Sequence, residues 1–280
     1  MSKVAVDGSN FQTNEEWRQF FDRFGAIVLV ANSETQDPVS LRRRFPHDTL
    51  FIFFNKVYKV LDDTFGAPSL LVSRSGAMGA NLVHRREVGD VLRFFPDANF
   101  LGILNIRTAC EERFSPPSAF EGAMVYHADL QPLVSVGYPN AKIPTSGYAL
   151  VVWLRDLHVR PRIHLSGFSG KRSDRWKVFD VHDWTFERAY FRLLAEQRLI
   201  SLGETDQGLA RFELLKTHFP ELTNEQIQSA LNEVFASRID NALSHIDRLM
   251  SITKWQRKLD TLFRKARPRT RKQKFQDDKT

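Results

Sequence analysis

Short, continuous apolar runs that each end in polar residues constrain the fold of this chain most strongly. Three of them follow one another in the first third of the sequence, at residues 26–32, 49–55 and 69–76. Runs of this kind are typical of strands that are buried on both faces, as in parallel sheets covered by helices. Apolar residues at helical spacing precede the first run, and Gly25 predicts the end of that helix.

The rest of the first 200 residues continues this alternation of strands and helices. We expect a strand at 100–106, a loop at 111–122 and, further along, a strand at 162–168; the expected helices are 39–45, 84–95, 148–158 and 184–200. Alternating strands and helices indicate an α/β fold. The sequence therefore predicts a mostly parallel, Rossmann-like sheet flanked by helices.

The pattern changes after residue 204, where helical spacing continues without further strands. Thr223 and Gln226 have the spacing of a capping box, which predicts a helix start. We therefore expect a Rossmann-like domain at 1–204, an all-helical C-terminal extension at 205–266 and a basic, disordered tail at 267–280.

Positive charge is concentrated near the C-terminus. Residues 254–274 hold ten Lys or Arg and one Asp, whereas the whole chain of 280 residues carries only +7, so the other 259 residues together carry −2. Trp255, Leu259, Leu262 and Phe263 share one helical face in this segment. A basic helix with an apolar stripe favours an anionic membrane surface. A solubilising end explains the segment equally well, and nucleic acid is the least favoured partner.

The composition excludes several classes of protein. The single cysteine, Cys110, excludes an intrachain disulfide scaffold and a cysteine-based zinc site. The first residues have no apolar core of a signal peptide, and no apolar run approaches the ~20 residues that a membrane span needs. We therefore expect a cytoplasmic protein, with peripheral contact at the inner face of the cytoplasmic membrane if the tail binds lipid.

Polar residues stand where the predicted strands end. Asn32 and Ser33 follow the first strand, Asn55 follows the second, Ser73 lies at the end of the third, and Ser166-Gly167 ends a later one. Because the carboxyl ends of parallel strands meet at one edge of a sheet, we expect these residues to line a ligand site. Each could equally be a turn residue.

Residues 144–187 contain the strongest candidate chemistry. Thr145-Ser146-Gly147 opens a helix, where free N–H groups favour a phosphate, although a simple N-cap explains the same residues. His182 precedes another helix and is a candidate general base, with a capping or surface histidine as the alternative. Lys171 and Arg172 lie in a basic loop that could neutralise a leaving phosphate or simply be solvated.

Other catalytic motifs are missing from the sequence. It has no dinucleotide fingerprint, no P-loop and no G-x-S-x-G, and its histidines show no H-E-x-x-H and no dense cluster. There is also no D-x-D, with which many nucleotide-sugar transferases hold a divalent metal. We therefore expect no metal site and no cofactor.

The order of these motifs resembles that of the bacterial CMP-sialic acid sialyltransferases of the Campylobacter type, and more broadly of the sialyltransferase superfamily with its CMP-Kdo-using members. The resemblance covers about residues 26–200 and implies that 1–204 is a nucleotide-sugar-binding catalytic domain. It implies that Ala31-Asn32-Ser33 and Asn55 contact the nucleotide or sugar, and that Thr145-Ser146-Gly147 holds the donor's phosphate or carboxylate. It further implies that Ser166-Gly167 lies beside the cytidine and that His182 is the general base.

The chain departs from this family in two places. The first turn lacks the glycines of the family's G-N-G, and the tyrosines that assist the leaving phosphate are not visible after Ser166-Gly167. On this comparison Lys171, Arg172 or Trp176 would serve instead. A CMP-sugar has a single phosphate, so a helix N-terminus and one or two basic side chains could stabilise its departure without a metal.

The leading hypothesis is thus an inverting, metal-independent glycosyltransferase that moves a sialic acid or Kdo-type sugar from a CMP donor. Its partners would be a surface glycan or glycolipid acceptor, as in lipopolysaccharide or capsule biosynthesis, and an anionic membrane surface through 254–274. A non-catalytic nucleotide- or glycan-binding protein in polysaccharide assembly is the first alternative. A nucleic-acid-associated α/β protein that uses the basic tail is the second.

Overall fold

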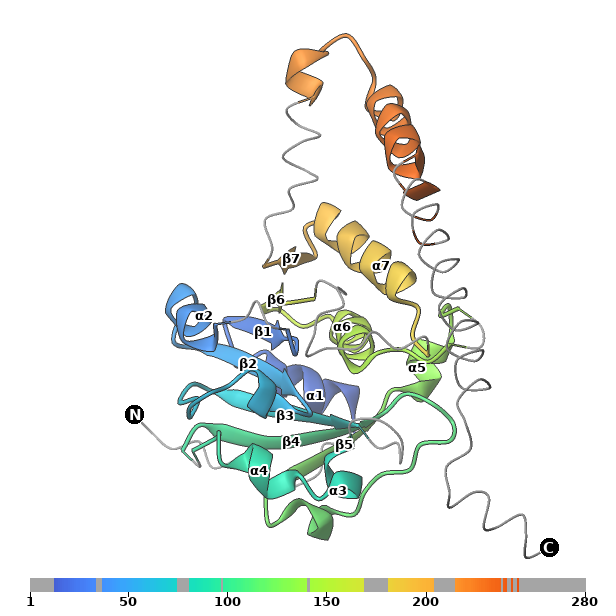
Figure 1. The fold of residues 1–280 in the computed structure, drawn as a ribbon. Helices are drawn as coiled ribbons and strands as arrows, with labels where there is room; N and C mark the ends of the chain where they lie inside the picture. The colour runs from blue at the N-terminus through green and yellow to red at the C-terminus, as the bar shows by residue number, and fades with distance from the viewer. Residues whose placement is uncertain are drawn as a thin grey trace, which may run out of the picture. The chain divides into compact units, whose positions relative to one another are not determined.

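The first part of the chain folds around one sheet of parallel strands (Figure 1). The computed structural model describes residues 13–33, 37–74, 81–96, 98–139, 142–168, 181–203 and 215–237, with 239, 240, 243 and 246. The chain divides into two compact units, residues 1–205 and 206–280. The seven strands are β1 (Ala26–Val30), β2 (Thr49–Phe54), β3 (Ser69–Arg74), β4 (Phe100–Arg107), β5 (Val125–Asp129), β6 (Arg162–Ser166) and β7 (Ile200–Leu202). The predicted α/β class is confirmed.

The strand order reverses at β1. The sheet runs β5-β4-β3-β2-β1-β6-β7, and every neighbouring pair is parallel. The chain therefore builds outward from β1 to β5, returns to the other side of β1 with β6, and then continues to β7. In an open parallel sheet, the carboxyl edge at such a reversal is where ligands bind.

The reversal decides which face of the sheet each helix covers. Parallel crossovers are right-handed, so connections that run in opposite directions along the sheet lie on opposite faces. The connections from β1 to β5 contain α2 (Pro38–Arg44), η1 (Val57–Lys59), α3 (Leu82–Arg85), α4 (Val88–Leu92) and η2 (Pro117–Phe120). The other face receives α1 (Asn14–Phe21), α5 (Gln131–Ser135), α6 (Ser146–Asp156) and α7 (Trp184–Glu196).

Strands β1 to β5 each contribute to two cores because successive side chains point to opposite faces of the sheet. In β1, Ile27 and Leu29 pack with α1, α6 and α7, whereas Val28 and Val30 pack with the helices of the other face. All five residues of β1 are buried. This double burial explains why the strands are continuous apolar runs without alternation.

The N-cap of α1 fixes where the helix begins, and its aromatic face determines how it packs. Thr13 and Glu16 form a reciprocal capping box, with the Glu16 N–H 3.2 Å from Thr13 Oγ1. Trp17 is buried and its ring lies edge-on to Trp153 of α6, with 4.9 Å between the ring centroids. The first helix therefore packs directly on the helix that carries the Thr145-Ser146-Gly147 start.

Two predicted helices are wrong in extent. The segment 84–95 contains α3 and α4, separated at Arg86, whose left-handed backbone (φ 58°) ends α3. The helix expected to reach residue 200 ends at Glu196. After it, Arg198 adopts a left-handed backbone and Ile200 begins β7. Apolar spacing continues through both turns, so periodicity alone does not show where the helix stops.

Other short elements were not predicted. Strand β5 and helix α5 follow the expected loop 111–122, which itself contains η2. Strand β5 reads Val-Tyr-His-Ala-Asp, a mixed pattern rather than an apolar run, because it pairs only with β4 at the edge of the sheet. An edge strand needs less apolar sequence than a central one.

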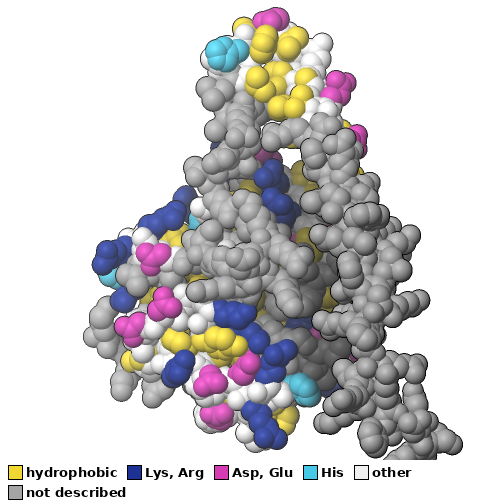
Figure 2. Space-filling view, in the orientation of Figure 1, with side chains coloured by type: hydrophobic (Ala, Val, Ile, Leu, Met, Phe, Trp, Pro, Cys, Tyr) yellow, Lys and Arg dark blue, Asp and Glu magenta, His cyan; other side chains and the backbone are white. Residues whose placement is uncertain are grey.

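The second unit is helical where it is described, at 215–218 and 224–237. The predicted capping box is present, with the Thr223 N–H 2.8 Å from Gln226 Oε1. Figure 2 shows exposed apolar side chains on this unit. The exposed large apolar residues of the unit include Phe235 and Ile239. Within the part of the chain that the structure describes, every helix is too short or too polar to span a bilayer.

We expect Trp17→Ala to lower the free energy of unfolding of the first unit by about 3–5 kcal/mol, because it removes the ring contact with Trp153 of α6 and leaves a cavity. Urea unfolding followed by tryptophan fluorescence and circular dichroism measures this loss. Leu193→Ala is the matched control, because Leu193 lies on the exposed side of α7 and its side chain is 64% exposed. An equal loss in both variants would contradict the packing described for α1.

Candidate functional site

The predicted strand-end residues flank the point where the strand order reverses. Asn32 and Ser33 follow β1, and Ser166 and Gly167 end β6, its neighbour on the other side. The Ala31 N–H donates to the Ser166 carbonyl at 2.9 Å, so the two chain segments leave the sheet side by side. Gly167 has a left-handed backbone (φ 79°), which glycine adopts without strain. These four residues lie at the position where open parallel sheets bind their ligands.

Asparagine side chains join the strand ends along the same edge. Asn32 Nδ2 donates to the Phe54 carbonyl at the end of β2, at 2.9 Å. Asn55 Oδ1 accepts the N–H of Arg74 at the end of β3, at 3.2 Å, and Asn55 itself has a positive φ of 36°. One amide atom of each side chain therefore holds a neighbouring strand, as expected of turn residues.

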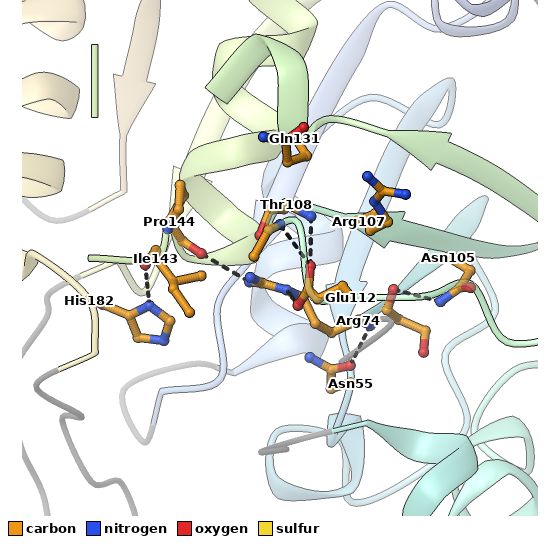
Figure 3. Close-up of polar contacts among 12 residues, drawn as sticks. Asn55, Arg74, Asn105, Arg107, Thr108, Glu112, Gln131, Ile143, Pro144 and His182 are labelled. Carbon is orange, nitrogen blue, oxygen red and sulfur yellow. Dashed lines mark hydrogen bonds and ion pairs between the residues drawn. The ribbon is translucent and has the colours of Figure 1, made fainter. Parts of the chain in front are cut away.

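The end of β3 is the most buried part of this edge. Ser73 is fully buried, and its hydroxyl has no hydrogen-bond partner within the described structure. The Ser73 carbonyl accepts a hydrogen bond from Asn105 Nδ2 of β4 at 3.2 Å (Figure 3). Ser73 thus lies beneath the surface of the edge, where its backbone is part of the tie between β3 and β4.

Thr145 is the N-cap of α6, and its polar atoms are engaged by the protein. Its Oγ1 accepts the Tyr148 N–H at 3.1 Å and donates to Glu187 Oε2 at 2.6 Å. Its N–H donates to Glu187 Oε1 at 2.8 Å. The capping interpretation therefore accounts for Thr145, and Ser146 and Gly147 are the predicted residues that remain at this helix start.

Glu187 is a buried carboxylate that connects three segments. It is 2% exposed and accepts hydrogen bonds from Thr145 and from the Tyr138 hydroxyl, the latter at 2.7 Å. The same hydroxyl accepts the Asp183 N–H at 3.0 Å. Burial raises the pKa of Glu187, although the hydrogen bonds and the charge of Arg74 act in the opposite direction. Glu187 thus holds α6 against α7 from inside the protein.

Gly147 lies where the start of α6 packs against the segment that follows Ser166-Gly167. A Cβ atom at this position would clash with the ring of Phe168, which directly follows Gly167. The ring of Phe168 lies edge-on to Phe191 of α7, with 5.6 Å between the ring centroids. Glycine is therefore required at position 147 so that the residue after Ser166-Gly167 can pack on the start of α6.

His182 is held in one tautomer. Its Nδ1 lies 2.6 Å from the Ile143 carbonyl, and because a carbonyl only accepts, Nδ1 carries the proton (Figure 3). The lone pair of the neutral ring is then on Nε2. Burial lowers the pKa of His182, the charge of Arg74 lowers it further, and the hydrogen bond to Ile143 acts in the opposite direction. The arrangement favours a neutral imidazole with a basic Nε2 near neutral pH.

The structure places Arg74 and Glu112 among these residues, although neither was predicted as a site residue. Their side chains form an ion pair, and Arg74 Nη1 also donates to the Pro144 carbonyl at 2.9 Å. Arg74 is the last residue of β3, and Glu112 lies in the loop that follows β4. Charged residues at such positions were the available signal, since Arg74 lies in the Ser-Arg-Ser-Gly that ends the third apolar run.

Several predicted residues cannot be placed in the site. Lys171, Arg172 and Trp176 lie outside the residues that the structure describes, as does the basic segment 254–274. Among the described side chains, no three histidine, cysteine, aspartate or glutamate residues lie close enough to form a metal site.

We expect Glu187→Ala to lower the free energy of unfolding by about 2–4 kcal/mol, because it leaves the donors of Tyr138 and Thr145 without their acceptor. Glu187→Gln should stay within about 1 kcal/mol of wild type, since it keeps an acceptor and removes a buried charge. Chemical unfolding measures both changes, and Glu196→Ala at the exposed end of α7 is the control.

The pH dependence of the same stabilities gives a second check. The pKa of Glu187 is higher in the folded state than in the unfolded state. The contribution of Glu187 to stability is therefore fully present below its pKa in the unfolded state, and it is lost as pH rises through its pKa in the folded state. Wild type should therefore lose stability relative to Glu187→Gln as pH rises through that range. A difference that does not change with pH would contradict the raised pKa.

Comparisons with protein-family models, curated proteins and solved structures find no match for this chain. Its function is therefore inferred from the chemistry of the site.

Proposed function

We propose that this chain is an inverting, metal-independent glycosyltransferase that moves a sialic acid or Kdo-type sugar from a CMP donor to a glycan or glycolipid acceptor. One observation carries the proposal: His182 is held by the Ile143 carbonyl as the tautomer whose Nε2 is basic. Through this contact His182 lies against Ile143, which is three residues before the first residue of α6, Ser146. A base next to a helix N-terminus suits the transfer of a sugar from a phosphate.

The reaction requires one proton transfer and one substitution at carbon. His182 Nε2 takes the proton of the acceptor hydroxyl while that oxygen forms a bond to the anomeric carbon. The bond from the anomeric carbon to the phosphate oxygen breaks on the opposite face, and CMP leaves with the electron pair. Because attack and departure occur on opposite faces, the configuration at the anomeric carbon inverts.

The departing phosphate needs positive potential but no strong acid. At the start of α6, the N–H groups of Thr145 and Tyr148 are bonded within the protein. We therefore assign the phosphate to the N–H groups of Ser146 and Gly147, at the positive end of the helix dipole. The nucleoside would occupy the crevice between Asn32 and Ser166, at the reversal of strand order.

The donor class is tested by thermal unfolding of the full chain with CMP, UDP, GDP or ADP. We expect stabilisation by CMP alone, of about 2.7 kcal/mol when the nucleotide is present at 100 times its dissociation constant. No stabilisation by CMP would contradict the proposal. CMP binding by a wild-type protein that never releases CMP from a CMP-sugar would instead indicate a non-catalytic nucleotide-binding protein.

The role of His182 is tested by the release of CMP from CMP-sialic acid or CMP-Kdo. His182→Ala should lower kcat/KM by about 10²- to 10⁴-fold, the usual contribution of a general base. It should still be stabilised by CMP. His47→Ala is the matched control, because His47 is exposed and precedes β2 at the opposite edge of the sheet. Full activity of His182→Ala would rule out the assigned base.

The pH profile of wild-type kcat/KM provides a further test. A general base acts only when it is unprotonated, so activity should fall as pH falls through the pKa of His182. Burial and the charge of Arg74 lower that pKa from 6.5, and the acid midpoint should therefore lie below 6.5. A midpoint at or above 6.5 would contradict the assignment.

A further inference from the structure

Residues 143–145 carry the contacts that hold the candidate site together. The Ile143 carbonyl accepts from His182 Nδ1, and the Ile143 N–H donates to the Val181 carbonyl at 2.9 Å. Thr145 is held by Glu187 through both its N–H and its hydroxyl. Between them, the Pro144 carbonyl faces the opposite side of the site, toward the end of β3 (Figure 3).

Arg74 is the side chain that binds this middle carbonyl. Its Nη1 lies 2.9 Å from the Pro144 oxygen, and its Nε is paired with Glu112 Oε1. The two side chains are only 12% and 11% exposed. The guanidinium is therefore held on one side by a carboxylate and on the other by the chain segment that carries His182's acceptor.

Glu112 is itself fixed by the backbone after β4. Its Oε2 accepts the N–H groups of Thr108, at 2.7 Å, and Ala109, at 3.1 Å (Figure 3). The backbone N–H of Arg74 is fixed as well, by Asn55 Oδ1. Both ends of the Arg74 side chain are thus anchored at the carboxyl edge of the sheet.

We propose that Arg74 is a positioning residue for His182: by binding the Pro144 carbonyl it holds the adjoining Ile143 carbonyl in place, and so fixes the tautomer and the orientation of the imidazole. The position of the imidazole is thereby fixed by the sheet as well as by the loop that carries His182. Trp184, whose ring lies edge-on to His182 with 5.4 Å between centroids, supports the imidazole from the α7 side.

The charges around His182 are consistent with this role. Arg74 from β3 is the cation that lowers the pKa of His182, after the larger effect of burial. The acidic groups near the same segment are Glu112, which is paired with Arg74, Glu187, which is bound by Thr145 and Tyr138, and Asp183, which caps α7 through the Phe186 N–H. Lys142, which directly precedes the segment 143–145, is exposed.

The position and the charge of Arg74 both act on the neutral histidine. By holding the Ile143 carbonyl in place, Arg74 keeps the proton of His182 on Nδ1. Its positive charge disfavours a second proton on Nε2. The consequence for catalysis rests on the proposed function, because only a general base needs a fixed Nε2. The tautomer and the titration of His182 can be measured without any substrate.

The test is long-range ¹H–¹⁵N NMR of the histidine rings in the full chain, with the signals of His182 identified by their loss in His182→Ala. We expect wild type to show an Nδ1-protonated ring that titrates below 6.5. Arg74→Gln should move the titration up toward 6.5 and produce a mixture of tautomers. Arg74→Lys, which restores the charge, should return the titration toward that of wild type.

Arg107→Gln is the matched control, because Arg107 ends the neighbouring strand β4 and pairs with Asp129 at 3.3 Å. It should leave His182 unchanged. If Arg74→Gln fails to fold because Glu112 is left unpaired, the double variant Arg74→Gln/Glu112→Gln removes both charges together. A folded Arg74→Gln or double variant in which His182 keeps its wild-type titration and single tautomer overturns the proposal.

Kinetics then separate this inference from the proposed function. If CMP-sugar turnover is present, Arg74→Gln should lower kcat/KM by about 10- to 100-fold and shift the acid limb upward, with partial rescue in Arg74→Lys. Turnover with an unaltered His182 in Arg74→Gln would refute the positioning role and leave the transferase intact. The expected NMR changes in a protein that neither binds CMP nor turns over a CMP-sugar would refute the transferase and leave the positioning role intact.

Discussion

The return of the chain to β1 is the constraint on which the rest of this structure depends. Once β6 pairs with β1 on the side opposite β2, right-handed crossovers require helices on both faces of the sheet. The same return places the segments that follow β1 and β6 side by side at the carboxyl edge. The burial of the central strands on both faces and the place of the candidate site therefore have a common origin.

The segment 143–145 converts this edge into a site with defined chemistry. It receives Arg74 from β3, His182 from the loop before α7 and Glu187 from within α7. Such a junction buries charged and polar groups, which is tolerated only because each has a partner of the right kind. The lowered pKa of His182 and the raised pKa of Glu187 have the same leading cause, which is their removal from water.

The central strands and the longest helices were predictable, because each depends on a local pattern. Strands β1 and β2 are apolar throughout, and α6 has a threonine N-cap followed by apolar residues. The edge strands β5 and β7 were not predicted, because short strands with a single neighbour need little apolar sequence. The end of α7 was missed because the turn at Arg198 depends on backbone hydrogen bonds that apolar spacing does not report.

The sequence by itself determined that this chain forms a covered parallel sheet and that Asn32, Asn55, Ser73 and Ser166 belong to one edge of it. Strand ends of a parallel sheet must meet, whatever the order of the strands. Only the tertiary structure decided what each residue does there. It assigned the asparagine amides to neighbouring strands, Thr145 to Glu187 and the Nδ1 proton of His182 to Ile143, and it brought in Arg74 and Glu112. Those partners lie between 19 and 70 residues apart in the chain, so no local pattern contains them and only packing brings them within hydrogen-bonding distance.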